Sequence, residues 1–250
     1  MSETLNGKVA VITGGAKNLG GLTSINLAKA GADVLIHYHG DNAKVEAETT
    51  AKTIRELGRK VSIFQGDLSK PEVVTAMFEQ AKKELGGVDI AVNNVGMVLR
   101  KPIVETTEKE YDTMFNVNTK SAYFFIKEAG KQLNDNGKII SIVTSLLGAF
   151  TDGYSTYAGA KASVEHFTRA AAKEFGVRGI SVTSIAPGPM DTPFFYAQET
   201  PERVAYHKSN GIGNQLTQIE DIVPIVKFLA TEGWWITGQT IFANGGYTTR

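Results

Sequence analysis

Two residues spaced four apart, Tyr157 and Lys161, carry the side chains that acid–base chemistry on a carbonyl or an alcohol requires. In a helix this spacing places both side chains on one face. A tyrosine hydroxyl with its usual pKa of about 10 exchanges protons poorly at neutral pH, and a nearby ammonium group favours the phenolate. The pair therefore predicts a general acid at Tyr157, with Lys161 lowering its pKa.

The same spacing joins Tyr123 to Lys127, so the pair alone is not specific. Ser145 follows an apolar run and precedes Tyr157 by twelve residues, whereas no serine at a strand end stands shortly before Tyr123. A hydroxyl at a strand end can hydrogen-bond an oxygen on which negative charge develops. The sequence therefore favours Tyr157 as the reactive tyrosine and predicts that Tyr123 and Lys127 serve helix packing.

A glycine-rich turn, Thr13–Gly20, joins an apolar run to a helical pattern. Glycines at such a turn let the backbone approach a pyrophosphate held at the helix N-terminus. Glycine-rich turns between a strand and a helix also arise for packing alone, so the turn by itself leaves both interpretations open.

Short apolar runs rich in β-branched residues alternate with helical patterns along the whole chain. Runs that are apolar throughout are typical of strands buried on both faces, as in a parallel sheet covered by helices. The sequence predicts one α/β domain over residues 1–250, with a doubly wound, parallel seven-stranded sheet. The expected strands are 9–12, 34–36, 61–64, 90–92, 139–143, 180–185 and 240–243, and the helices after the first turn are 42–57, 71–85, 108–133, 157–175 and 220–231.

Residues 193–216 interrupt this alternation as one long insertion. An insertion of that length in a compact fold is usually a lid or a binding segment, and a packed helical hairpin is the alternative.

The composition excludes several classes of protein. The chain has 250 residues, enough to bury a core without disulfide or metal cross-links. Its 26 Lys and Arg balance 26 Asp and Glu, which removes the simplest argument for nucleic acid or a membrane as a partner. It has no cysteine, which excludes disulfide scaffolds and cysteine nucleophiles. Since no signal peptide or membrane-spanning run is apparent, we expect a cytoplasmic protein.

Five segments at predicted strand ends resemble, in the same order, those of the short-chain dehydrogenase/reductase family. The segments are Thr13–Gly20, Gly66–Leu68, Asn93–Gly96, Pro187–Thr192 and Ile236–Gly246. The resemblance implies a Rossmann-type fold with helices on both faces of the sheet, and an oxidoreductase activity that uses a nicotinamide cofactor.

The resemblance also implies a catalytic set of Asn118, Ser145, Tyr157 and Lys161. In the family, the second hydroxyl of the segment after the fifth strand is catalytic, which selects Ser145 over Thr144. Ser145 would hydrogen-bond the carbonyl oxygen and Tyr157 would donate the proton. Lys161 would bind the nicotinamide ribose, and Asn118 would hold a water that relays protons.

A larger set of residues would hold the cofactor. Asn18 stands where the family's T-G-x3-G-x-G turn has its middle glycine, and since Asn tolerates a positive φ we expect a shifted contact rather than a lost site. The implied cofactor residues are Gly14, Lys17, Asn18, Leu19, Gly20, Tyr38, His39, Asp67, Leu68, Asn94, Gly96, Tyr157, Lys161, Pro187, Gly188 and Thr192.

The residues at the expected adenosine end favour NADP(H) over NAD. No acidic residue follows the second strand until Asp41, so none stands at the strand end to repel a 2′-phosphate. Lys17 resembles the basic residue of NADP-using family members and can form a charge-assisted contact with that phosphate. His37 and His39 alternate without a third ligand nearby, so we expect no metal site.

Apolar and aromatic residues near the catalytic turns and in the insertion are expected to line the substrate pocket. No Arg or Lys is placed to clamp a phosphate or a carboxylate, which favours a hydrophobic ketone that NADPH reduces to a secondary alcohol. The alternatives are an NAD-linked alcohol or sugar dehydrogenase, a 3-oxoacyl thioester reductase, or a protein that senses NADPH without catalysis. The predicted lining is Met97, Leu146, Leu147, Phe150, Tyr154, Pro189, Met190, Phe194, Phe195 and Tyr196.

The helices predicted at 108–133 and 157–175 carry apolar residues on more than one face, among them Phe115, Phe124 and Phe167. One face would cover the sheet and a second would meet another copy of the chain. The family resemblance implies a homotetramer assembled through these helices and the C-terminal strand.

Overall fold

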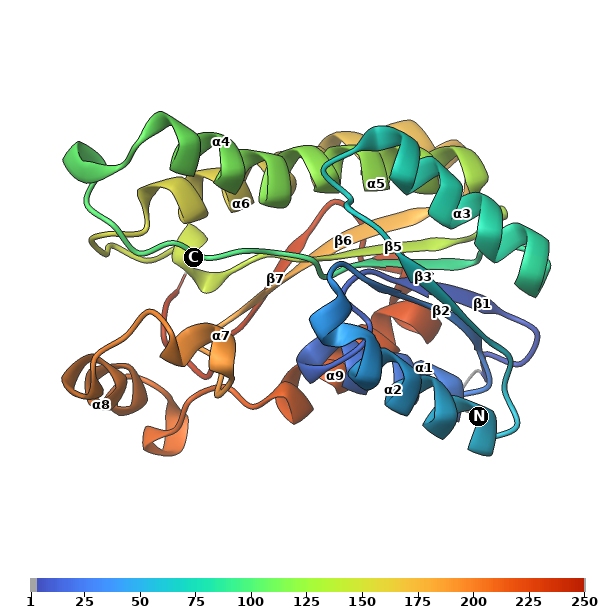
Figure 1. Ribbon diagram of the computed structural model, residues 1–250, viewed down its shortest axis with the longest axis horizontal. Coiled ribbons are helices and arrows are strands. Elements are labelled where there is room, and N and C mark those ends of the chain that lie inside the picture. Colours follow the sequence, from blue (N-terminus) through green and yellow to red (C-terminus); the bar gives the residue numbers. More distant parts are fainter. Residues whose placement is uncertain (1–3, 250) are drawn as a thin grey trace.

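A computed structural model of the chain describes residues 4–249, within which seven parallel strands form one sheet in the order β3-β2-β1-β4-β5-β6-β7 (Figure 1). Residues 1–3 and 250 of the predicted domain lie outside the described residues. The strands of the sheet's interior are buried along their whole length, as their apolar sequences require. The predicted doubly wound sheet is confirmed. The strands are β1 (Val9–Ile12), β2 (Asp33–Tyr38), β3 (Val61–Gln65), β4 (Ile90–Asn93), β5 (Lys138–Ile142), β6 (Ser181–Pro187) and β7 (Thr240–Ala243).

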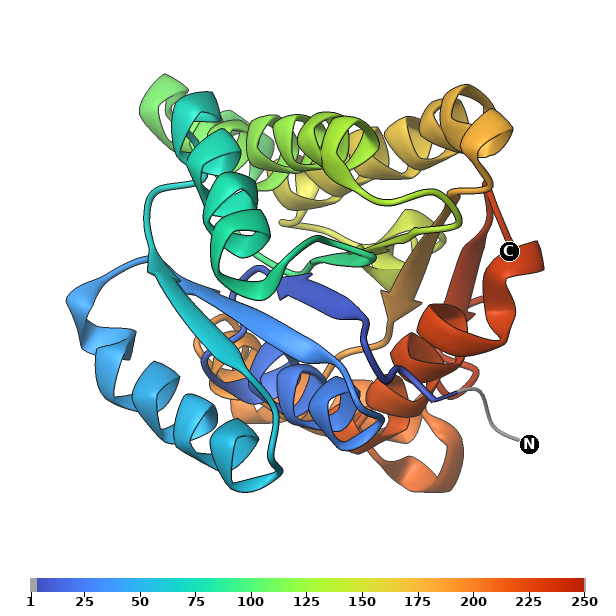
Figure 2. The same ribbon diagram turned by 90° about the vertical axis from the view of Figure 1, so that its right-hand side faces the viewer.

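Helices cover both faces of the sheet (Figure 2). Each face buries its own apolar layer, one centred on residues such as Ile36 and Val226 and the other on Met77 and Phe125. The helices on the first face are α1 (Asn18–Lys29), α2 (Lys44–Glu56) and α9 (Ile219–Thr231), and those on the second are α3 (Pro71–Leu85), α4 (Glu108–Phe115), α5 (Ser121–Gln132) and α6 (Ser155–Phe175).

The strand order reverses at β1, which pairs with β2 on one side and with β4 on the other. The connections that leave the carboxyl ends of β1 and β4 therefore run to opposite faces of the sheet. In doubly wound sheets this reversal opens a crevice at the carboxyl ends of the strands, where ligands bind.

The helix predicted over 108–133 is interrupted. A π-helical turn, η3 (Asn116–Lys120), separates α4 from α5. The interruption lies where Asn118 hydrogen-bonds the carbonyl oxygens of Met97 and Met114 as well as the N–H of Met97. Such turns are rare within helices and often stand at functional sites.

The insertion 193–216 is helical and contains α7 (Pro193–Tyr196) and α8 (Pro201–Ser209). It lies beyond the carboxyl end of β6, in orange at the lower left of Figure 1. Of the helices in residues 4–249, none has the length and apolar character needed to cross a bilayer.

Candidate active site

Tyr157 and Lys161 are both buried in the first two turns of α6. Lys161 Nζ donates a hydrogen bond of 2.9 Å to the carbonyl oxygen of Ile142, the last residue of β5. A Cβ atom at Gly96 would lie 3.2 Å from the same Nζ, so the turn after β4 can approach Lys161 closely because it has a glycine there. The lysine is thus held between the ends of two strands at the crevice.

Burial sets the protonation of this pair. It raises the pKa of Tyr157 to about 12 and lowers the pKa of Lys161 to about 8, because an apolar environment disfavours the charged form of each group. The prediction that Lys161 lowers the Tyr157 pKa below its ordinary value is therefore wrong: burial outweighs any such effect. Tyr157 is protonated at neutral pH, which is the form that donates a proton to a carbonyl oxygen.

The hydroxyl that hydrogen-bonds Tyr157 belongs to Thr144, which the family resemblance had set aside in favour of Ser145. A hydrogen bond from the Thr144 side chain lowers the Tyr157 pKa, although less than burial raises it. Thr144 Oγ1 also accepts from Leu146 N at 3.3 Å, which fixes the short turn Ser145–Leu147. Ser145 is buried beside it, and both residues line the cavity that Tyr157 enters. The only sequence signal for Thr144 was its place directly before Ser145.

Asn118 is buried in η3 with its whole amide engaged by the backbone. Its Oδ1 accepts from Met97 N at 3.0 Å, and its Nδ2 donates to the carbonyl oxygens of Met97 at 2.8 Å and Met114 at 3.0 Å. Asn118 therefore links the segment after β4 to the helical segment α4–η3, in which Asn118 itself lies. A Cβ at Gly96 would lie 3.1 Å from Asn118 Oδ1, so Asn118 and Lys161 flank the same glycine.

The glycine-rich turn is tied to the end of β4 by Thr13 and Asn94. Thr13 Oγ1 accepts from the backbone N–H groups of Asn94 at 2.8 Å and Val95 at 3.1 Å. Asn94 Nδ2 donates to the carbonyl oxygen of Thr13 at 3.1 Å. These bonds hold together the two strand ends between which the crevice opens.

Asn18 has a positive φ of 49°, so it takes a left-handed backbone conformation at the start of α1. This is the conformation that asparagine tolerates best after glycine. Gly20 cannot be replaced in the same way, because a Cβ there would lie 2.1 Å from the carbonyl oxygen of Gly14. The turn thus keeps its shape with asparagine at the expected glycine.

A cleft of about 760 Å³ follows the crevice, and Tyr157 and Lys161 are among the residues that line it. Pro187 and Gly188, predicted for the cofactor, line instead a second cavity that adjoins the cleft, and Thr192 lines both. The cleft is also lined by residues that were not predicted: His37, one residue before the end of β2, and Asn42, Ser69 and Val95 in the segments after β2, β3 and β4. Their places near strand ends were the signal available. The predicted cofactor residues that line the cleft are Gly14, Lys17, Asn18, Leu19, Gly20, Tyr38, His39, Asp67, Leu68, Asn94, Gly96, Tyr157, Lys161 and Thr192.

At the far end of the cleft Lys17 forms an ion pair with Glu46 of α2, with 3.1 Å between Nζ and Oε1. The side chains are about half exposed, at 48% and 40%. The sequence indicated the cation but not this internal partner, since Glu46 lies beyond the second strand. Glu46 therefore competes with a cofactor 2′-phosphate for the ammonium group of Lys17, which was predicted to select NADP(H).

His37 stabilises the glycine-rich turn Thr13–Gly20 by a hydrogen bond with Gly14. Its Nδ1 accepts from Gly14 N at 3.2 Å, so its Nε2 carries the hydrogen that is donated to the carbonyl oxygen of Gly66 at 2.9 Å. Burial lowers the pKa of His37 to about 4, so the ring is neutral. Within residues 4–249 no group of three or more His, Cys, Asp or Glu side chains is arranged to hold a metal ion.

A second cavity of about 80 Å³ adjoins the cleft at Tyr157. It is lined by six of the ten predicted pocket residues, whereas Met97 lines the cleft. Three predictions are wrong. Phe150 is exposed, Leu147 packs into a core with Val164, and the Tyr196 hydroxyl turns away to Asp191 at 2.7 Å. The predicted residues that line this cavity are Leu146, Tyr154, Pro189, Met190, Phe194 and Phe195.

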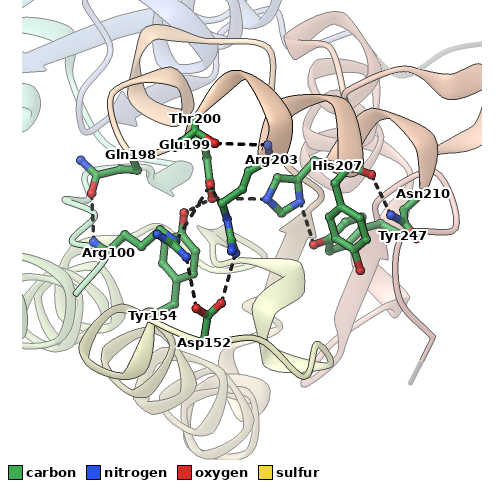
Figure 3. Close-up of polar contacts among 11 residues, drawn as sticks. Arg100, Asp152, Tyr154, Gln198, Glu199, Thr200, Arg203, His207, Asn210 and Tyr247 are labelled. Carbon is green, nitrogen blue, oxygen red and sulfur yellow. Dashed lines mark hydrogen bonds and ion pairs between the residues drawn. The ribbon is translucent and has the colours of Figure 1, made fainter. Parts of the chain in front are cut away.

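The prediction of an apolar pocket also needs correction, because one wall is polar (Figure 3). Glu199, His207 and Tyr247 line the cavity together with Tyr154. The Tyr154 hydroxyl donates to Glu199 Oε1 at 2.5 Å, and the Glu199 side chain is fully buried. Glu199 and His207 come from the insertion and Tyr247 from the segment after β7, and nothing in their spacing signalled that they would meet Tyr154, which precedes α6.

A short-chain dehydrogenase/reductase from Pestalotiopsis microspora is 34% identical to this chain over 257 residues, covering 97% of this chain and 96% of that protein. The chain belongs to the short-chain dehydrogenase/reductase family. Within the family, the model described as enoyl-(acyl carrier protein) reductase matches residues 14–248.

The descriptions of two further relatives of this short-chain dehydrogenase/reductase mention NADPH or NADP. An NADPH-dependent aldehyde reductase-like chloroplastic protein of Arabidopsis thaliana is 34% identical over 256 residues, covering 97% of this chain and 95% of that protein. The crystal structure of a putative dehydrogenase from Burkholderia cenocepacia with bound NADP superposes with a TM-score of 0.98. It shares 55% identity and covers 100% of this chain and 97% of that one. The Rossmann-type fold expected from the sequence is thereby confirmed.

Proposed function

We propose that this short-chain dehydrogenase/reductase reduces a ketone to a secondary alcohol with NADPH. The observation that carries the proposal is the position of Tyr157, which lines both the dinucleotide cleft and the adjoining substrate cavity. A proton donor at that junction stands where a bound cofactor and a bound carbonyl would meet.

The cleft fits a dinucleotide phosphate. Gly14 and Gly20 approach each other so closely that a Cβ at Gly20 would clash with the Gly14 carbonyl, which leaves backbone rather than side chain facing the crevice. Lys17 supplies a cation at the expected 2′-phosphate end, and no acid stands at the end of β2. The NADP in the Burkholderia cenocepacia structure and the name of the Arabidopsis thaliana relative support the same cofactor.

When bound, NADPH supplies the hydride that reduces the carbonyl carbon. Ser145 and Tyr157 hydrogen-bond the carbonyl oxygen and stabilise the charge that develops there. Tyr157 then transfers its hydroxyl proton to that oxygen, while Thr144 donates to the tyrosine oxygen and stabilises the phenolate left behind. Lys161, anchored on Ile142, supports the same phenolate and binds the nicotinamide ribose, and Asn118 supports reprotonation through water.

The Tyr157→Phe variant tests the proposal. The aromatic ring is retained, so we expect NADPH binding, followed by fluorescence titration, to stay within about twofold of the wild type. Because the proton donor is lost, we expect kcat for ketone reduction to fall by at least about 10²-fold. A variant that keeps a tenth or more of the wild-type kcat would contradict the role of Tyr157.

Assays with several substrates separate this proposal from its alternatives. An NAD-linked alcohol or sugar dehydrogenase would prefer NAD in initial-rate measurements, and a 3-oxoacyl thioester reductase would favour acyl-thioester ketones. A protein that only senses NADPH would bind it without consuming it with any carbonyl compound. The buried Tyr157 and Lys161 favour an enzyme, since a sensor needs no proton donor.

We also propose that the enzyme is a cytoplasmic homotetramer. In support of the assembly, Tyr123 is half exposed on α5 and contacts Phe124 and Phe167, which form an aromatic surface on α5 and α6. Sedimentation equilibrium at micromolar concentration distinguishes a tetramer from a monomer, and fractionation of the source cells tests the location.

A further inference from the structure

The polar wall of the substrate cavity is a continuous hydrogen-bonded chain (Figure 3). Tyr247 donates its hydroxyl proton to His207 Nδ1 at 2.9 Å, because the other ring nitrogen, Nε2, points to Glu199 Oε1 at 3.3 Å and carries the hydrogen. Tyr154 donates to the same carboxylate oxygen at 2.5 Å. Both tyrosine protons are therefore directed into the wall and away from the cavity.

The wall is electrically balanced from behind. Arg203 pairs with Glu199 at 2.9 Å and with Asp152 at 3.2 Å, and Arg100 pairs with Asp152 at 3.2 Å. Glu199 lines the cavity, whereas neither arginine does. Two arginines thus offset two carboxylates, and the wall has no surplus charge with which to bind an ion.

Apart from the Glu199 carboxylate, the titratable side chains of the wall that line the cavity are neutral. Burial, together with Glu199, raises the pKa of Tyr154, and burial raises the pKa of Tyr247. Burial lowers the pKa of His207 more than the neighbouring Glu199 raises it, so the ring is neutral at neutral pH. The two hydroxyl groups therefore persist as hydroxyls.

A hydroxyl that donates a hydrogen bond to a neighbour still has oxygen lone pairs, with which it can accept another hydrogen bond. The Tyr154 and Tyr247 oxygens can therefore accept from a ligand but cannot donate to one without breaking the chain. A wholly apolar ligand would exclude water from these oxygens without replacing its hydrogen bonds, which costs affinity. The wall selects a ligand group that donates, such as a hydroxyl.

Aromatic rings set the shape of the remaining space. The Tyr157 ring lies 6.4 Å, centre to centre, from both the Tyr154 ring and the Phe194 ring. Phe195 lines the same cavity and packs edge-on against His207. These faces suit a flat, ring-bearing substrate whose carbonyl meets Tyr157 while its other end meets the polar wall.

We propose that the substrate is a ring-bearing hydroxyketone whose hydroxyl donates a hydrogen bond to Tyr247 or Tyr154 while its carbonyl oxygen binds Tyr157. This inference rests on the proposed function and adds the substrate class to it. Tyr154 and Tyr247 then act as specificity-determining residues, with Glu199 and His207 holding their protons in place.

The test compares α-tetralone with its ring-hydroxylated isomers, using NADPH and the full-length enzyme. We expect the wild type to show a kcat/KM at least about tenfold higher for one hydroxylated isomer than for the parent ketone, the difference that one well-made hydrogen bond provides. We expect Tyr247→Phe to lower this ratio about three- to tenfold. Tyr154→Phe should lower it as well, and thermal unfolding shows whether each variant remains folded.

Tyr206→Phe is the matched control. Tyr206 lies on α8 next to His207, is 61% exposed, and does not line the cavity. Its removal should leave the ratio unchanged.

The outcomes separate this inference from the proposed function. Reduction of none of the ketones, together with no NADPH consumption on a wider carbonyl panel, would defeat the proposed function itself. Reduction of α-tetralone as efficiently as every hydroxylated isomer would overturn the inference and leave the proposed function standing. A hydroxyl preference that survives in folded Tyr247→Phe and Tyr154→Phe variants would overturn the assignment to this wall.

Discussion

At the scale of single residues, the reactive hydroxyl groups divide their roles by what each one touches. Thr144 hydrogen-bonds Tyr157 and caps the turn that follows, whereas Ser145 lines the substrate cavity. Thr144 thereby offsets part of the pKa increase that burial imposes on Tyr157. Ser145 is left free to bind the substrate oxygen, so the two hydroxyls affect different measurements.

The first prediction separates these roles by pH. Alcohol oxidation requires ionised Tyr157, so its rate rises with pH through the tyrosine pKa. In Thr144→Ala that pKa rises further above its wild-type value of about 12, so we expect the oxidation rate at pH 9 to fall about tenfold, the equivalent of one hydrogen bond. Ser145→Ala should lower kcat at every pH without changing the tyrosine pKa. Equal profiles for the two variants would contradict the division.

The Lys17–Glu46 ion pair leads to a second prediction. Glu46 holds the cation that we assign to the 2′-phosphate, so Glu46→Gln should lower the KM for NADPH. An exposed pair is weak, so we expect a change of no more than about fivefold. Glu48→Gln, on the same helix and paired with Arg55 at 3.9 Å, is the control. An unchanged KM in Glu46→Gln would show that Lys17 does not contact the phosphate.

At the scale of elements, the π turn η3 connects the helix α4–α5 to the catalytic end of the sheet. The amide of Asn118 takes the place of the regular helical bonding there and binds both the N–H and the carbonyl of Met97. The segment after β4, including Gly96, is held against Lys161 in consequence. The interruption therefore positions the site as well as shaping the helix.

Asn118→Ala should affect stability and activity together. The variant leaves the buried N–H of Met97 without its partner, which should lower the free energy of unfolding by about 1–3 kcal/mol in urea titrations. Because the segment that flanks Lys161 is loosened, kcat should fall by at least tenfold. Asn118→Asp retains the acceptor for Met97 N but sets a carboxylate oxygen against the carbonyl oxygens of Met97 and Met114, so it should not restore the stability. Wild-type stability in the alanine variant would contradict this role.

At the scale of the whole molecule, the sheet encloses ionisable groups whose protonation responds to unfolding. His37 is buried on β2 with a pKa of about 4, whereas an unfolded chain gives histidine a pKa of about 6.5. Between these values the unfolded state binds the proton that the folded state excludes. The free energy of unfolding therefore falls as the pH drops from about 6.5 towards 4.

For His37 alone this linkage amounts to about 3 kcal/mol, because its pKa values in the unfolded and folded states, 6.5 and about 4, differ by about 2.5. Denaturant titrations at several pH values measure it. His37→Asn keeps an acceptor near Gly14 N but removes the titrating ring, so its stability should depend less on pH between 6.5 and 4. His166→Asn, on the exposed side of α6, should retain the wild-type slope. A variant His37→Asn with the wild-type slope would contradict this assignment.

The sequence by itself determined the sheet and the residues at its strand ends. Apolar runs such as Val9–Ile12 can only be buried on both faces, and a parallel sheet brings the ends of its strands to one edge. The family resemblance then indicated which residues at those ends would hold a cofactor, and of these Lys17, Asn94, Tyr157 and Thr192 line one cleft. Their geometry follows from local pattern and topology together.

Only the tertiary structure decided the environment of each group. The pKa of Tyr157 depends on how completely neighbouring segments exclude water, which no spacing encodes. The polar wall joins Tyr154, Glu199, His207 and Tyr247 from distant parts of the chain, and Phe150, apolar and next to the catalytic turn, is exposed. Contacts between residues far apart in sequence depend on the path of whole segments, so the cofactor cleft was predictable and the substrate wall was not.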